Sequence, residues 1–329
     1  LKAYEQVLAL PSTPEQKADA HLSMAEVFFK QRNFPAAAKN YGEVINNEKS
    51  PSRGFAAYRM AWVDFNTGRI EPGIQALVKI LRTPELSRRS AIAGAGADQQ
   101  FQEEVSRDLA TFMAKRRVQK DDLNTLFEVS PASTKVANLM YLAGEAERLG
   151  QTNEALQLWQ FVHSKQSEPR ERLESLIHIA GLQIAGGGGD QALTSYENAL
   201  QLWQTLGGCV GEGCKELRTR VKNTLVDWNR VEKKNPSEQL VKAYQAFTQT
   251  FPEDTAMRMY LAQVARERKD YNLALNTYMA VGRSGVEESE PALIAAIETA
   301  ELAVAADPKP AATAEKAAPT ETQPSVNAL

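Results

Sequence analysis

The chain has 329 residues, of which 38 are Lys or Arg and 41 are Asp or Glu, so its formal net charge is −3. This balance gives no strong field that would indicate nucleic acid or an anionic membrane as a partner. No apolar run approaches the roughly 18–20 residues that cross a bilayer, and no alternating β-branched pattern predicts strands. The composition therefore favours an all-α chain without direct membrane insertion.

A spacing of small and larger apolar residues recurs along the chain, starting near its first residues. Ala25 is followed twelve positions later by Ala37, and Tyr41 lies four positions further on. This spacing is typical of two short antiparallel helices, because small residues let the two backbones approach. We call this spacing the repeat frame. It returns in four more copies, whose first small residues are Ala61, Ala143, Ala180 and Ala262. Repeated helix pairs stack into a solenoid, so we expect a surface that holds a partner.

The spacing between copies sets the predicted boundaries. First small residues are 36, 82, 37 and 82 positions apart, so each long step predicts a diverged helix pair. These two inserts share an apolar pattern, Val105, Leu109 and Phe112 in one and Val221, Leu225 and Trp228 in the other. The predicted order is the end of a preceding repeat (1–17), two repeats (18–83), a diverged pair (84–134), two repeats (135–208), a Cys loop with a diverged pair (209–253), a repeat (254–290), a solvating capping helix (291–306) and a disordered tail (307–329).

Apolar–small pairs within the copies resemble the tetratricopeptide repeat (TPR). They are Met24-Ala25, Met60-Ala61, Leu142-Ala143, Ile179-Ala180 and Leu261-Ala262, each followed by a turn and a second small residue. The segment from Leu149 to Leu156 is especially similar to that family's turn and second-helix opening. The resemblance implies a right-handed α-solenoid of TPR-like helix pairs, here with two diverged inserts. It also implies a non-catalytic scaffold or adaptor that binds a protein or peptide segment in its concave groove.

The same resemblance indicates which residues would line the groove. Family groove positions lie three before, one after and four after the first small residue. Here they are Leu22, Glu26 and Phe29 in the first copy and Tyr58, Trp62 and Phe65 in the second, with Phe55 one turn earlier. Spacings of three and four place the second set on one helical face. Two interpretations stay open: a groove for an amphipathic helix or apolar peptide, or a face that other parts of the chain cover.

Cys209 and Cys214 are the only cysteines, and they flank a Gly-containing connection. Glycine permits the tight loop that would bring two sulfur atoms within bonding distance, so the pattern favours a disulfide. A disulfide would indicate an oxidising compartment such as a bacterial periplasm; the alternative is two unpaired thiols in a cytosolic loop. A metal site needs further ligands, and the three histidines, His21, His163 and His178, are scattered, so we predict none.

No motif of the sequence predicts catalysis or a cofactor. The stretch 186–190, Gly-Gly-Gly-Gly-Asp, lacks the Lys and Ser or Thr that complete a phosphate-binding loop. The second candidate function is a purely architectural module that self-assembles or joins subunits through its ends and outer faces. A weaker resemblance to large periplasmic TPR proteins of gliding-motility and envelope machinery implies a periplasmic or cell-envelope location, with the cytoplasm as the alternative. Because the sequence begins at Leu1, we expect further repeats or a signal sequence before it; the pattern does not set the oligomeric state.

Overall fold

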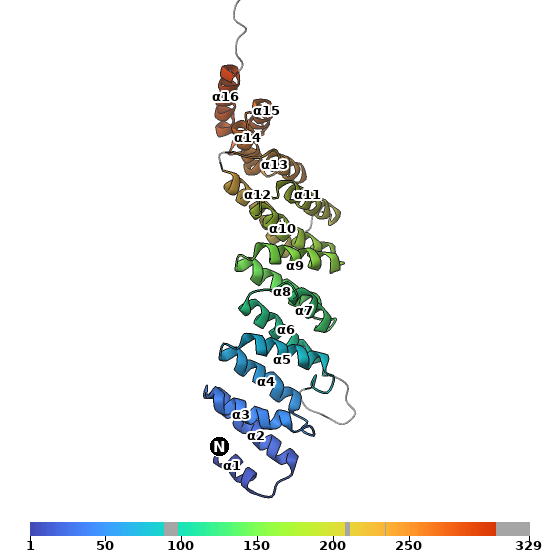
Figure 1. The fold of residues 1–329 in the computed structure, drawn as a ribbon. Coiled ribbons are helices and arrows are strands. Elements are labelled where there is room, and N and C mark those ends of the chain that lie inside the picture. Colours follow the sequence, from blue (N-terminus) through green and yellow to red (C-terminus); the bar gives the residue numbers. More distant parts are fainter. Residues whose placement is uncertain (89–97, 208–210, 234, 307–329) are drawn as a thin grey trace, which may run out of the picture. The chain divides into compact units, whose positions relative to one another are not determined.

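A computed structural model of the chain describes residues 1–88, 98–207, 211–233 and 235–306. These described residues contain sixteen α-helices and no strand, which confirms the all-α prediction (Figure 1). The chain forms two compact units, Leu1–Lys233 and Lys234–Leu329. None of the described helices combines the length and the apolar character that a membrane crossing requires.

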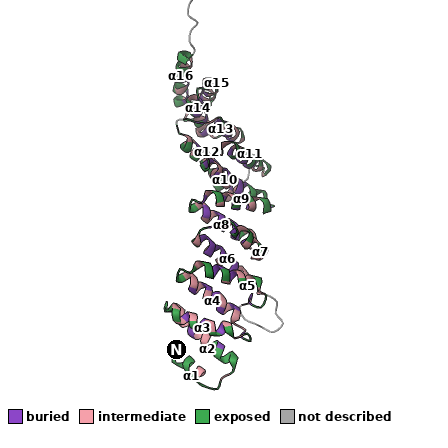
Figure 2. Cartoon of the chain, in the orientation of Figure 1, coloured by how far each residue is buried: buried purple, intermediate pink, exposed green. Residues whose placement is uncertain are grey.

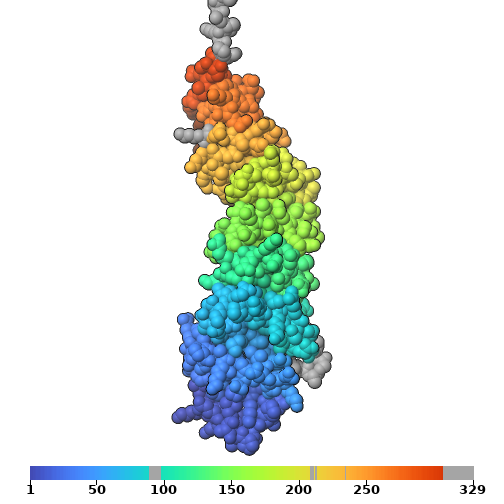
Figure 3. Space-filling view, viewed as in Figure 1, coloured from blue at the N-terminus to red at the C-terminus, as the bar shows by residue number. Residues whose placement is uncertain are grey.

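The first unit contains twelve of these helices. They are α1 (Lys2–Ala9), α2 (Pro14–Lys30), α3 (Phe34–Asn46), α4 (Arg53–Asn66), α5 (Ile70–Arg82), α6 (Gln99–Arg116), α7 (Asp122–Val129), α8 (Lys135–Arg148), α9 (Thr152–Lys165), α10 (Pro169–Ala185), α11 (Gly189–Thr205) and α12 (Glu212–Glu232). From α1 to α11 each helix packs on the next one. On the surface of unit 1 the colours accordingly follow one another in chain order (Figure 3). In addition, α6 packs on α8, and α12 packs on α10.

The second unit contains α13 (Glu238–Thr250), α14 (Thr255–Glu267), α15 (Tyr271–Gly282) and α16 (Ser289–Ala306). Its helices also pack in chain order, α13 on α14, α14 on α15 and α15 on α16. The first predicted insert contains α6 and α7. The second contains α12, which belongs to the first unit, and α13, which belongs to the second.

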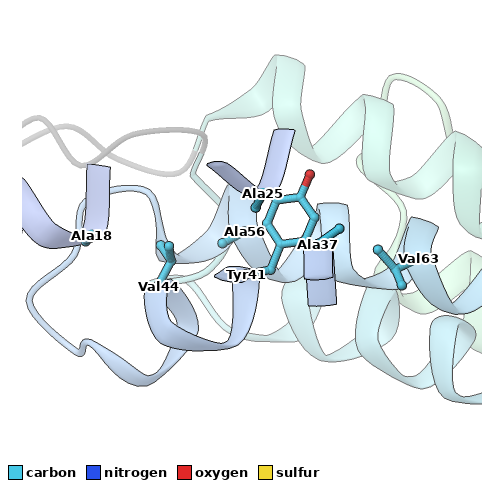
Figure 4. Close-up of a cluster of buried hydrophobic side chains, with 7 residues drawn as sticks. All are labelled: Ala18, Ala25, Ala37, Tyr41, Val44, Ala56 and Val63. Atoms are coloured by element: carbon cyan, nitrogen blue, oxygen red, sulfur yellow. The ribbon is translucent and has the colours of Figure 1, made fainter. Parts of the chain in front are cut away.

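Small residues of the repeated frame lie where the helices meet. Ala25, Ala37 and Tyr41 are fully buried, and they share one core cluster with Ala56 of the next helix (Figure 4). The small residues of the other alanine copies are fully buried as well: Ala143, Ala155, Ala180, Ala192, Ala262 and Ala274. In the second copy the frame uses Gly73, where an added Cβ would come within 2.9 Å of the Phe112 ring. The spacing therefore reflects a steric requirement at each helix crossing.

The turn between the two helices has the same backbone conformation in every copy. The residue seven positions after the first small residue has a positive φ in all five: Arg32 (57°), Gly68 (80°), Gly150 (70°), Gly187 (78°) and Lys269 (66°). Glycine adopts this left-handed conformation without steric cost, whereas other residues are strained there. In the two copies without glycine the next residue, Asn33 or Asp270, caps the second helix by accepting a backbone N–H hydrogen bond (3.3 and 3.0 Å). The frame imposes the turn even where glycine is missing.

Replacing Lys269 with glycine is expected to raise the free energy of unfolding of the second unit by up to about 1 kcal/mol. The substitution relieves the left-handed strain, and the greater flexibility of glycine in the unfolded chain offsets part of the gain. Urea unfolding of the two proteins measures the difference. The matched control, Gly150→Ala, places a Cβ at a φ of 70° and is expected to lower stability by about 1 kcal/mol. A loss of stability in Lys269→Gly would show that this turn is not strained.

Candidate interaction groove

The aromatic face predicted on α4 packs against α6. Tyr58 is only 5% exposed, and its ring meets Phe101 edge-on at a centroid distance of 5.6 Å. Trp62 meets Phe112 edge-on at 5.1 Å, and Phe65 lies 4.4 Å from the same Phe112 ring. Helix α6 belongs to the first diverged insert. The second interpretation of this face, burial by another part of the chain, therefore describes Tyr58, while Phe55, Trp62 and Phe65 stay partly exposed.

A carboxylate of α6 joins this packing. Tyr58 Oη donates a hydrogen bond to Asp108 Oδ2 (2.6 Å), and Trp62 Nε1 donates to the same oxygen (2.9 Å). Tyr58 Oη also lies 3.1 Å from Glu104 Oε1. Burial raises the pKa of Asp108 above its usual range, although both hydrogen bonds lower it in part. The polar atoms of Tyr58 and Trp62 are thus used within the chain.

The predicted groove residues of the first copy are also engaged with neighbouring helices. Glu26 accepts two hydrogen bonds from the Arg59 guanidinium (2.7 and 3.2 Å) and one from the Tyr41 hydroxyl. The same guanidinium lies over the Phe29 ring, 4.0 Å from its centroid. Leu22 packs against the core cluster of this copy. These contacts join α2, α3 and α4 and leave Glu26 without a free carboxylate oxygen for a partner.

A hollow of about 590 Å³ opens at the corresponding positions of the third and fourth copies. It is lined by Glu147, Thr152, Ile177, His178, Gly181, Leu182, Ile184, Ala185, Arg220, Asn223, Thr224, Asp227 and Val231. Four of these, Glu147, Ile177, Gly181 and Ile184, occupy the groove positions of the repeat frame on α8 and α10. The opposite wall is α12 of the second insert. We call this hollow, between α8, α10 and α12, the α12 groove.

One end of the α12 groove is polar and held in place by its neighbours. Glu147 Oε2 accepts a hydrogen bond from Trp159 Nε1 (3.1 Å) and lies 2.9 Å from His178 Nδ1. The Trp159 and His178 rings are stacked with their centroids 4.1 Å apart and their planes nearly parallel, at 4°. The Glu147 carboxylate is therefore held in place by Trp159 of α9 and His178 of α10.

The α12 side of the groove carries paired charges and one exposed apolar residue. Arg220 pairs with Glu174 (2.6 Å) and Glu216 (3.0 Å), and Asp227 pairs with Arg230 (2.6 Å). Val231 is 61% exposed beside them. Across from it, Ile177 and Ile184 line the α10 wall, although only 7% and 8% of their surfaces are exposed. This arrangement suits binding of an apolar side chain more than proton transfer, because most of its charges already have partners.

The sequence pattern alone does not single out this hollow. Groove positions of the third and fourth copies, read alone, give the mixed set Met140, Glu147, Ile177 and Ile184. The second wall comes from α12, which does not follow the frame.

A usable signal was present at the covered face: Phe101, Val105, Asp108 and Phe112 are spaced by four, three and four, so a single carboxylate lies on the apolar face of a helix. Such a carboxylate requires partners, and Tyr58 and Trp62 are those partners.

The remaining predicted residues are the two cysteines. Cys214 is in the first turn of α12, is buried and is disulfide-bonded. Its predicted partner, Cys209, lies outside the described residues. Among the described residues no group of His, Cys, Asp and Glu is arranged to hold a metal ion.

No family model and no curated protein sequence matches the chain. Similar solved structures include the C-terminal part of a TPR repeat-containing protein from Cytophaga hutchinsonii (10% identity, 82% of this chain and 98% of that chain, TM-score 0.36). They also include yeast Tom70 (14%, 89% and 61%, TM-score 0.32) and the TPR domain of P58(IPK) (12%, 87% and 99%, TM-score 0.19). All three TM-scores are below 0.5, so no property of these proteins is carried over to this chain.

Proposed function

We propose that the chain is a non-catalytic, TPR-like scaffold that binds a helical or extended segment of a partner protein in the α12 groove. The observation that carries the proposal is the combination of an open hollow of about 590 Å³ with apolar side chains on two facing helices. This volume lies in the usual range of ligand sites, roughly 300–1,000 Å³. Val231 would contact an apolar anchor of the partner, with Ile184 on the opposite wall. The fixed Glu147 carboxylate would orient a hydrogen-bond donor of the same segment.

The covered face on α4 supports the choice of this groove over the aromatic positions. A partner could reach Tyr58 only by displacing α6, which would break the bonds to Asp108. The α12 groove needs no such rearrangement. Rigid binding of a short segment therefore favours the hollow that is already open.

Photocrosslinking tests the proposal. A photoreactive residue at position 231, introduced in the native host, is expected to capture a defined partner segment, identified by mass spectrometry. The same residue at the exposed position of Tyr141, outside the groove, is the matched control. A synthetic peptide of the captured segment should bind the purified chain, and Val231→Asp should weaken it about tenfold or more, because a charge replaces the apolar contact. Equal crosslinking at both positions, or unchanged affinity in Val231→Asp, would contradict groove binding.

We also propose that the chain works in an oxidising compartment, the periplasm or the cell envelope. The disulfide-bonded state of Cys214 supports this location, because such bonds form and persist in oxidising environments. Thiol labelling in intact cells under non-reducing conditions should leave Cys214 unmodified until a reductant is added. Immediate labelling would instead favour the cytoplasm.

A further inference from the structure

The last described helix, α16, has an apolar exposed side. Ala292, Ala296 and Thr299 face α15 and are buried. On other sides of the helix the exposed large apolar residues are Leu293, Ile294, Ile297, Leu302 and Val304. Much of α16 is therefore coloured as exposed (Figure 2). The sequence predicts a solvating capping helix over 291–306, and α16 spans this range.

Three of these residues, Leu293, Ile297 and Val304, lie on one face of the helix together with Ala300, whereas Leu302 lies on the opposite face. Leu293, Ile297, Ala300 and Val304 are separated by four, three and four positions, the spacing at which one helix packs along another. Ile297 is 63% exposed and Val304 is 73% exposed. At the start of the stripe, Leu293 lies against Gly282 of α15, where an added Cβ would come within 2.6 Å of it. We call this surface the α16 stripe.

An exposed stripe of this kind is costly to leave in water. Each square ångström of apolar surface that a partner removes from water stabilises a complex by roughly 25 cal/mol. Soluble monomers seldom leave contiguous apolar patches uncovered without a binding role. The α16 stripe is thus a candidate interaction surface on the second unit, formed by other residues than the α12 groove on the first.

Charge identifies the kind of partner. Helix α16 contains Glu290, Glu298 and Glu301 and no Lys, Arg or His. Glu298 pairs with Arg266 of α14 (3.3 Å). Glu290 and Glu301 lie on the flank of the stripe, because Glu290, Ile294, Ile297 and Glu301 follow the same four, three and four spacing. The border of the α16 stripe is therefore acidic.

We propose that the α16 stripe docks an amphipathic helix of a partner protein whose apolar side is flanked by Lys or Arg. Its apolar residues would pack along Leu293, Ile297 and Val304, and its basic flank would face Glu290 and Glu301. A second copy of α16 fits poorly, because glutamates would meet glutamates. An anionic membrane surface meets the same repulsion.

Fluorescence anisotropy with two labelled peptides tests the proposal on the full chain. Both peptides carry Leu and Ile in a heptad stripe; one has Lys on its flanks and the other has Glu. The basic peptide is expected to bind at least about tenfold more tightly, and its affinity should fall as salt is raised. Ile297→Glu should remove about tenfold or more of that affinity. Because Ile297 is exposed, this variant is expected to fold, which circular dichroism checks.

Tyr260→Glu is the matched control, since Tyr260 is an exposed apolar residue of α14 in the same unit. Its affinity for the basic peptide should equal that of the unmodified chain. Equal binding of both peptides, or unchanged binding in Ile297→Glu, would overturn the proposal. Sedimentation velocity provides a further check: a dimer of the unmodified chain that Ile297→Glu converts to a monomer would assign the α16 stripe to a second copy and would also overturn it.

Discussion

Replacing Phe112 with alanine is expected to lower the free energy of unfolding of the first unit by about 3–5 kcal/mol, the usual cost of removing a fully buried phenylalanine. Phe112 has no exposed surface and contacts both Trp62 and Phe65. It also fills the space above Gly73, where even a Cβ would come within 2.9 Å of the ring. Its removal would leave a cavity between α4, α5 and α6 that these packed helices can close only in part.

Hydrogen exchange combined with urea unfolding measures this effect. In a stack of helix pairs each repeat contacts only its neighbours, so a local loss of stability need not reduce hydrogen-exchange protection equally in all repeats. Amides of α4–α6 should lose much more protection than those of α10 and α11. Phe161→Ala is the control, because Phe161 is only partly buried and should cost less. A uniform loss of hydrogen-exchange protection across the first unit would contradict the role assigned to Phe112. A decrease in the free energy of unfolding of less than about 1 kcal/mol would also contradict it.

Replacing Asp108 with alanine is expected to lower the free energy of unfolding by about 1–3 kcal/mol. The substitution removes the acceptor that Tyr58 Oη and Trp62 Nε1 share, and it leaves the indole N–H without its carboxylate partner. Asp108→Asn provides the comparison, since an amide oxygen can accept the same two hydrogen bonds without a buried charge. The alanine variant should therefore be clearly less stable than the asparagine variant in urea unfolding. Equal stabilities would show that the shared acceptor contributes little.

A second measurement compares how the free energy of unfolding depends on pH in the unmodified chain and in Asp108→Asn. Because burial raises the pKa of Asp108, the folded chain favours the protonated carboxyl. Its contribution to stability is fully present below the pKa of the unfolded state and is lost as pH rises through the folded pKa. The stability of Asp108→Asn relative to the unmodified chain should therefore increase as pH rises from the unfolded-state pKa of aspartate, about 3.9, through the higher pKa of the folded state. A difference that stays constant over this range would contradict a raised pKa.

The frame of the fold could be predicted because its causes are local. Ala25, Ala37 and Tyr41 follow from what a close helix crossing allows, and the structure buries all three. The site could not be predicted to the same extent. Tyr58 and Trp62 have the right positions for a groove, but α6, which lies in an insert without the frame, covers the face through Asp108 and Phe112. The contacts that decide exposure join residues about fifty positions apart. The local pattern of α6 indicates that Asp108 needs partners, but it does not identify Tyr58 and Trp62 as those partners.

The two inserts have opposite consequences for surfaces built from nearly the same repeat. Helix α6 packs on the aromatic face of the second copy and buries Tyr58, whereas α12 lies opposite the fourth copy and forms the far wall of an open hollow. The five copies of the repeat frame therefore do not present five equivalent surfaces. In a uniform array a ligand could slide from one register to the next, but irregular elements between the copies remove that degeneracy. If a partner binds in the α12 groove as proposed, the inserts determine where on the solenoid it binds, and changing an insert would move that site without changing any copy of the repeat frame.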